Sequence, residues 1–354
     1  MTDIRKLVKI LMNCKELYDE CGELYQYLRQ VRDNFLNLKQ FHNVPWQLSQ
    51  IVELMSASKL DKMPLNFEEI MINYAFNVKP KTNATKAVVS SFKTIFYITK
   101  VCNNKEFENK ENEIVLEMIN LYLRTYQQKP IKTINLIKDD KKYLQLLISG
   151  NFSNNPLYFF TIYLFLIERL IRTEKQKNAI RSGFINLYLI KNKLLFAPSI
   201  CFSYPLLTFY LNYKNVYEKV ISDNESIVEF SRFVFDLINQ ASVVSRAFIT
   251  DINKIKDKLD QIIKNEAKEN AILKKQFEYI LKSIIFIFDA DKKSNNKENQ
   301  IIECLNQHNL VSQVSTYENK KIYMFNEYIT SINKLLENKN EKTTKIFSLK
   351  EKMS

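Results

Sequence analysis

Glycine is the residue that this chain nearly lacks, because Gly22, Gly150 and Gly183 are the only three among 354 residues. Average usage is about 7%, so tight turns and close backbone approaches are built almost without it. Glycine-rich phosphate loops, such as G-x-G-x-x-G or the P-loop, are therefore excluded. Prolines number only seven, and long segments are rich in Leu, Ile, Lys, Glu and Asn. This composition predicts a mainly α fold with short loops between helices.

The length of the chain predicts more than one packed unit. Leu, Tyr and Phe recur at three- and four-residue steps from residue 3 to about 40, which predicts one long helix or a helical pair. Val44-Pro45-Trp46 is expected to end this pattern. Asn66 is predicted to cap a helix that begins with two acids. Further helices are predicted over the ranges 47–61, 84–101, 111–126, 141–171, 182–193, 204–220 and 227–268.

The last part of the chain changes character. Residues 271–288 are predicted to be helical, and 298–308 to form a short helix after a polar loop. A β-hairpin is predicted over 311–325, followed by a helix of roughly ten residues. We therefore expect the following organisation: an N-terminal helical region (1–83), a helical core (84–268), a small winged-helix-like module (269–337) and a polar tail (338–354).

The net charge of +13 is spread over the chain, because acidic residues alternate with basic ones nearly throughout. This pattern indicates solvated helix faces more than a nucleic-acid surface. The exception is the range 172–219, which contains eight Lys or Arg but only two acids. Five cysteines without C-x-x-C spacing and only two histidines predict neither a disulfide framework nor a metal site.

Two features predict a cytoplasmic protein without a membrane partner. The N-terminus has no signal-peptide core. The most apolar run, 157–167, is about half the length of a membrane span, so we expect a buried helix there.

Three stretches, in a fixed order, carry a family resemblance. The first is ELMSASKLDKMPLNFEEI (53–70), which is similar to the pattern E-A-x-x-S-S-x-I-E-G-I-x-T-T-x-E-E-V. The second runs from Leu123 through Pro156 to FINLYLIKNKLLFAPSICFSYPLLTFYLNY (184–213), and the third is IIECLNQHNLVSQVSTYENKKIYMFNEYITSINKL (301–335). Together they resemble a Fic-family protein with a Fic-type N-terminal region and a C-terminal winged helix. The resemblance implies a Fic-like helical bundle.

The resemblance also implies where the chemistry would lie. Fic proteins transfer AMP, or another phosphate-bearing group, onto a hydroxyl, using a loop of the form HPF-x-x-G-N-G-R. Its His takes the hydroxyl proton, an acid holds Mg²⁺ and the Gly-Asn-Gly turn cradles phosphates. Here the loop reads IRTEKQKNA (171–179), so the His position falls on Ile171. The position of the acid falls on Lys175, and the Gly-Asn-Gly turn falls on Gln176-Lys177-Asn178. The two Arg positions fall on Ala179 and Ser182.

Both the catalyst and its regulator are therefore expected to be degenerate. A missing general base costs about 10²–10⁴ in rate. The family's inhibitory motif, S-x-x-x-E-G, has a Glu that pairs with the second Arg, and its conserved positions fall on Ala57, Asp61 and Lys62. The remaining candidates for holding a nucleotide or another anion are four cations: Arg172, Lys175, Lys177 and Arg181.

The leading hypothesis is a Fic-like pseudoenzyme that binds a protein partner or a nucleotide, with no cofactor. One alternative is an active protein adenylyltransferase, which would use ATP with Mg²⁺ and a substitute base such as Asp140, Glu168 or a Tyr. A second is a winged-helix regulator that binds DNA, although two acids in 298–308 make nucleic acid the less favoured partner. The abundance of Lys and Asn indicates an AT-rich genome, as in a low-GC bacterium. The oligomeric state and the partner stay open.

Overall fold

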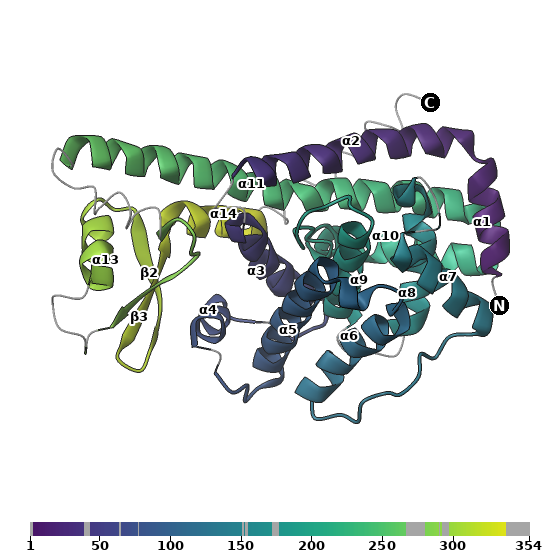
Figure 1. Cartoon of the computed structure of the whole chain (residues 1–354), viewed down its shortest axis with the longest axis horizontal. Coiled ribbons are helices and arrows are strands. Elements are labelled where there is room, and N and C mark those ends of the chain that lie inside the picture. The colour runs from purple at the N-terminus through teal and green to yellow at the C-terminus, as the bar shows by residue number, and fades with distance from the viewer. Residues whose placement is uncertain are drawn as a thin grey trace.

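The computed structural model describes residues 3–38, 43–63, 65–76, 78–150, 152, 155–171, 177–266, 280–289, 291 and 297–337. Within these residues the chain is mainly α-helical, with a three-stranded antiparallel sheet near the C-terminal end. Figure 1 shows a helical body at one end of the molecule and the sheet at the other, with long helices running along one side. The predicted fold class, mainly α with a small C-terminal module, is confirmed.

The N-terminal region forms a helical pair and two further helices. They are α1 (Ile4–Asn13), α2 (Lys15–Asn37), α3 (Asn43–Leu60) and α4 (Phe67–Phe76). The predicted cap is confirmed, since Asn66 Oδ1 accepts the Glu68 N–H at 3.1 Å. The expected break at Val44-Pro45-Trp46 is wrong, because α3 already begins at Asn43 and Pro45 lies in its first turn. Proline is tolerated there, since a first-turn N–H needs no helical acceptor.

The central helices follow the predicted periodicity with shifted ends. They are α5 (Asn83–Asn103), η2 (Lys105–Phe107), α6 (Glu111–Thr125), α7 (Lys138–Ser149), η3 (Pro156–Phe159), α8 (Phe160–Ile171), α9 (Lys177–Lys191), α10 (Ser203–Ser222), η4 (Asn224–Ser226) and α11 (Ile227–Glu266). Helix α5 begins with a reciprocal capping box between Thr82 and Thr85, which fixes its start.

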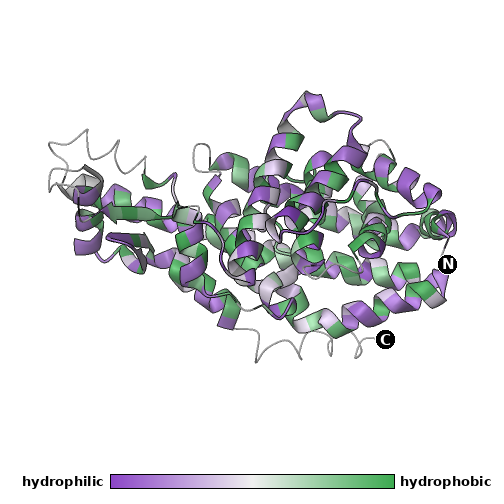
Figure 2. Ribbon diagram, turned by 90° about the horizontal axis from the view of Figure 1, so that it is seen from below, coloured by the Kyte–Doolittle hydropathy of each residue, from purple (hydrophilic) through white to green (hydrophobic). Residues whose placement is uncertain are grey.

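Helices α8 and α9 form the centre of the body. Every side chain of α8 from Phe160 to Ile167 is buried, as expected of a helix that is apolar on all sides. The outer helices are amphipathic: α1, for example, buries Ile4, Leu7, Val8 and Leu11. Figure 2 shows hydrophobic and hydrophilic residues alternating along the same helical ribbons, as one buried face requires.

Helix α11 connects the two ends of the molecule. With 40 residues it is about 60 Å long. It contacts α2, α3, α10 and α14, and Figure 1 shows α2 and α11 side by side along the body. The two ends are therefore joined by a shared helix.

The C-terminal module consists of β1 (Phe286–Asp289), α13 (Lys297–Gln307), β2 (Val311–Tyr317), β3 (Lys320–Phe325) and α14 (Asn326–Glu337). Its strand order is β1-β3-β2. The predicted hairpin and both short helices are confirmed. The predicted helix 271–288 is wrong at its end, where Phe286 pairs with Tyr323 in a strand. Aromatic and β-branched residues favour a strand there once a partner edge is present. Residues 271–279 lie outside the described residues.

The hairpin packs against the N-terminal region instead of standing free. The rings of Phe76, in α4, and Tyr317, in β2, lie 5.1 Å apart. Ser315 also bonds to the Glu68 carboxylate at 3.2 Å. On the other side of the module, α14 contacts α11 and α3. These contacts fix the module against the helical body.

We predict that Gly183 is required by the close approach of α9 to two neighbouring helices. A Cβ at this position would lie 3.1 Å from Thr94 Cγ2 and 3.3 Å from Met118 Cε. Gly183→Val should therefore lower the free energy of unfolding by about 1–3 kcal/mol in urea titrations. Gly22, in α2, has nothing within 4 Å of such a Cβ, so Gly22→Ala should raise stability by about 0.5–1 kcal/mol. Equal effects of the two changes would contradict this packing.

Candidate functional site

The end of α3 meets the start of α9, so the two motifs of the Fic resemblance lie together. The Asp61 carboxylate accepts a hydrogen bond from Asn178 Nδ2 at 2.5 Å, and the Asn178 backbone N–H points to the same oxygen at 3.5 Å. A carboxylate is favoured at a helix N-terminus, where unpaired N–H groups and the helix dipole carry positive charge. Ala57 lies buried one turn earlier on α3.

Lys62 follows Asp61 and keeps the backbone shape of the glycine that the resemblance expects there. Its φ is +56°, in the left-handed region that glycine enters without steric cost. This shape ends α3 and turns the chain, while the Lys62 side chain stays exposed.

Arg181 points into the protein and is only 1% exposed. Its guanidinium donates to both carboxylate oxygens of Glu168, with Nη2 to Oε2 at 3.1 Å, and Nη1 donates to Asn178 Oδ1 at 2.5 Å. The Tyr213 hydroxyl donates to Glu168 Oε1 at 2.7 Å, and its ring lies 5.2 Å from the guanidinium. A continuous polar network therefore runs from Asp61 through Asn178, Arg181 and Glu168 to Tyr213.

This network, defined by Asp61, Asn178, Arg181, Glu168 and Tyr213, joins four helical elements and has little access to solvent. Burial raises the pKa of Asp61 to about 6, although Asn178 donates to it and opposes the shift. Burial also raises the pKa of Tyr213 well above its ordinary value, and the neighbouring Glu168 charge adds to this. Each of the three guanidinium nitrogens of Arg181 donates a hydrogen bond within the network. The Glu168 carboxylate therefore neutralises the charge of Arg181 inside the protein.

Of the four predicted anion-binding cations, two lie within the described residues, namely Lys177 and Arg181. Lys177 is half-buried at the start of α9, with its ammonium 5.8 Å from the Tyr210 ring centre. Arg181, one turn further along the same face of α9, belongs to the buried network and lies over the Tyr213 ring. Arg172 and Lys175 lie outside the described residues. Ile171, at the position of the family's His, is fully buried at the end of α8.

The carboxylates named as substitute bases are both paired with arginines. Glu168 holds Arg181, and Asp140 accepts from Arg169 Nη1 at 2.7 Å with its own side chain 3% exposed. The Arg169 guanidinium lies over the Phe165 ring at 4.7 Å. These acids are therefore committed to structural ion pairs in this arrangement.

Glu53 is the site residue that sequence reasoning missed. It lies on α3 and is 3% exposed, and both of its carboxylate oxygens accept the Ser203 N–H, at 2.9 and 3.2 Å. Burial raises the pKa of Glu53 to about 7, although Ser203 and Ser182 donate to the carboxylate and oppose the shift. The one available signal was its place as the first residue of the Fic-like stretch 53–70.

A small cavity lies beside Glu53, with Ala57 and Ser182 in its wall. Its volume is about 20 Å³. That is room for a single water molecule, whereas small-molecule sites measure about 300–1,000 Å³. This cavity therefore does not hold a nucleotide.

Comparison with known proteins does not assign the chain to a family. No protein-family model matches the chain, and no curated protein matches it. Within the described ranges, His, Cys, Asp and Glu side chains form no group of three or more that could hold a metal ion. Over the same part of the chain, no helix has both the length and the apolar character needed to cross a bilayer.

We predict that Glu168 is needed because it neutralises Arg181. Glu168→Ala should cost about 3–5 kcal/mol of unfolding free energy, since it leaves a buried guanidinium unpaired. The matched control is Glu229→Ala, which breaks an exposed pair with Lys219 and should cost less than about 1 kcal/mol. Adding Arg181→Met to Glu168→Ala should recover part of the loss. Similar costs for Glu168→Ala and Glu229→Ala would show that the buried pair is not formed.

We predict that Glu53 makes stability fall as pH rises. The pKa of Glu53 is about 7 in the folded protein against an ordinary 4.5, so the folded state holds this proton more tightly. Its contribution is present below pH 4.5 and is lost as pH rises through 7. The stability of wild type relative to Glu53→Gln should drop by on the order of 2–4 kcal/mol between pH 4 and pH 8. A flat difference between wild type and Glu53→Gln over this pH range would contradict the shift.

Proposed function

We propose that this chain is a catalytically degenerate Fic-like protein that acts by binding a protein partner. One observation carries the proposal. The start of α9, where the resemblance puts the nucleotide phosphates, is occupied by the protein's own network of Asp61, Asn178, Arg181 and Glu168.

The charges of this network oppose phosphate binding. An incoming phosphate would meet the Asp61 carboxylate at the helix N-terminus instead of free N–H donors. Arg181 could reach a phosphate only by leaving Glu168, and an uncompensated buried charge costs about 3–5 kcal/mol. Of the described cations at this helix start, Lys177 alone is left to attract the nucleotide.

The transferase alternative is weakened because, among the described residues, no free base lies at the position of the catalytic His. The position of the catalytic His is the buried, apolar Ile171. Asp140 and Glu168 hold arginines, and protonation of either would disrupt its ion pair. ATP with Mg²⁺ would be the cofactor of this alternative and is not part of the proposed function.

The DNA-binding alternative is weakened by the packing of the hairpin. In a winged helix this hairpin would contact DNA, whereas here Tyr317 packs on Phe76 and the Lys320 ammonium lies 5.8 Å from the same ring. Exposed apolar side chains such as Leu211 (71% exposed) and Phe96 (61% exposed) could contact a protein partner.

We predict that the protein does not bind ATP at concentrations up to about 1 mM. The measurement is calorimetric titration of the folded, full-length protein, with and without Mg²⁺. Asp61→Ala should leave the result unchanged, because Arg181 stays paired with Glu168. Saturable heat that disappears in an Arg172→Ala, Lys175→Ala, Lys177→Ala variant would contradict the proposal. Arg181 is left intact in that variant because its removal would disturb the core.

The partner itself is tested by capture of the tagged full-length chain from its own cells. We expect one protein in a stoichiometric complex that survives size-exclusion chromatography. A chain that elutes alone, at the 42.1 kDa of a monomer, under gentle conditions would contradict a binding function. This result is independent of the ATP titration.

A further inference from the structure

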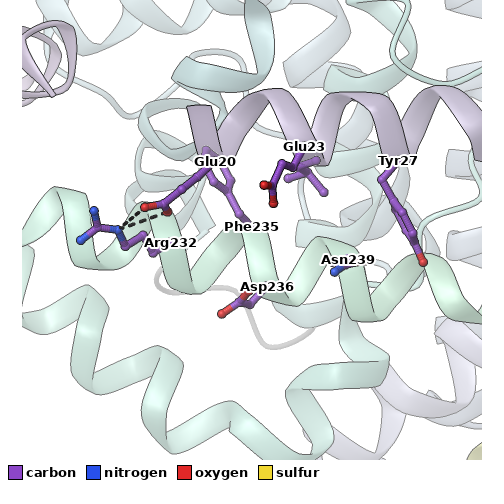
Figure 3. A pocket seen from close by; sticks show the side chains of 8 residues that line it. Glu20, Glu23, Tyr27, Arg232, Phe235, Asp236 and Asn239 are labelled. Atoms are coloured by element: carbon purple, nitrogen blue, oxygen red, sulfur yellow. Dashed lines mark hydrogen bonds and ion pairs between the residues drawn. The ribbon is translucent and has the colours of Figure 1, made fainter. Parts of the chain in front are cut away.

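A groove of about 410 Å³ lies between α2 and α11, and none of its lining residues belongs to the network at α9. Figure 3 shows Glu20, Glu23 and Tyr27 projecting from α2, opposite Arg232, Asp236 and Asn239 from α11. Leu24 and Phe235, both nearly buried, form its floor. The groove thus combines an apolar floor with a polar rim.

The rim is acidic on a protein of net charge +13. Glu20, Glu23 and Asp236 lie on it and are exposed. Arg232, also on the rim, donates to the Glu20 carboxylate at 2.9 Å and lies 3.4 Å from Glu16. Glu16, Glu20, Glu23 and Asp236 outnumber Arg232 on this part of the surface, so the groove has a negative field that attracts a basic segment.

Tyr27 lies at one end of the groove. The Tyr27 hydroxyl is buried and has no hydrogen-bond partner, while the Arg246 guanidinium lies 4.4 Å from its ring. A buried hydroxyl without a partner is costly.

We infer that the groove binds the C-terminal segment of this same chain, with Lys345-Ile-Phe-Ser-Leu-Lys350 as its centre. This segment places three apolar side chains between two lysines, which matches an apolar floor under an acidic rim. Residues 338–354 carry five lysines and two glutamates, so the whole segment has the opposite sign to the rim.

The direction of α14 leads the chain toward this groove. Lys258 of α11 pairs with Glu327 near the start of α14, and Ser331 bonds to Asp251. Helix α14 therefore runs antiparallel to α11, toward the end of α11 that carries the groove. At 3.6 residues per turn, Asp251 and Lys258 lie within roughly 60° of Asp236 around α11.

The distances allow the contact. If α14 keeps this course to Glu337, it ends about 13 Å along the α11 axis from Asp236, at 1.5 Å per residue. Lys345 follows Glu337 by about 25 Å of extended chain. Val243 is exposed on the same face of α11 as Asn239 and Asp236. It lies between the end of α14 and the groove, where it gives the segment an apolar contact.

The test is zero-length carbodiimide cross-linking of the full-length protein, because this reaction joins only lysines and carboxylates in direct contact. We expect mass spectrometry to find links from Lys345 or Lys350 to Glu20, Glu23 or Asp236. Mixing ¹⁴N and ¹⁵N protein beforehand separates links within one chain from links between two. Links only between chains would overturn the proposal in favour of a second copy, and the absence of any link would overturn it outright.

A second readout is tryptic cleavage at Lys345 and Lys350 under native conditions. In a Glu23→Gln, Asp236→Asn variant, cleavage should be roughly three- to tenfold faster than in wild type, because two charge contacts are lost. The matched control is Asp257→Asn, Asp260→Asn, which removes two exposed acids from α11 away from the groove. Equal cleavage rates in wild type and in both variants would contradict docking in the groove.

Discussion

The buried ion pair between Arg181 and Glu168 is the interaction on which the centre of this protein depends. It joins α9 to α8, and Tyr213 adds α10 through its bond to Glu168. Asn178 extends the network to Asp61 at the end of α3. Each member is costly to bury alone and is stabilised by the next, so the four elements are held in one arrangement.

The network that contains this ion pair also occupies the N-terminus of α9. In a Fic protein the corresponding turn would be open to phosphates, with glycines and arginines facing the ligand. Here Asp61 supplies the negative charge that the helix end favours, the two Arg positions are Ala179 and Ser182, and Arg181 bonds to Glu168. Lys62 keeps the left-handed turn expected of a glycine. The start of α9 is therefore a structural junction between α3, α8 and α9.

The sequence predicted the helices well because their apolar periodicity is local, and it predicted the C-terminal hairpin from alternation around a turn. It missed β1, since Phe286 becomes a strand residue only when Tyr323 is beside it. The site was harder to predict. Counting cations did not show that Arg181 is neutralised, because its partner Glu168 lies on another helix. Glu53 was missed because burial of an acid depends on distant elements, here the Ser203 N–H. The Fic resemblance itself stays a prediction.

The most direct test is a crystal structure of the full-length protein grown with millimolar ATP and Mg²⁺. It should show Arg181 bonded to Glu168, Asp61 bonded to Asn178 and no phosphate at the start of α9. Phosphate density at this helix end, with Arg181 released from Glu168 and turned toward it, would contradict a nucleotide site filled by the protein's own side chains.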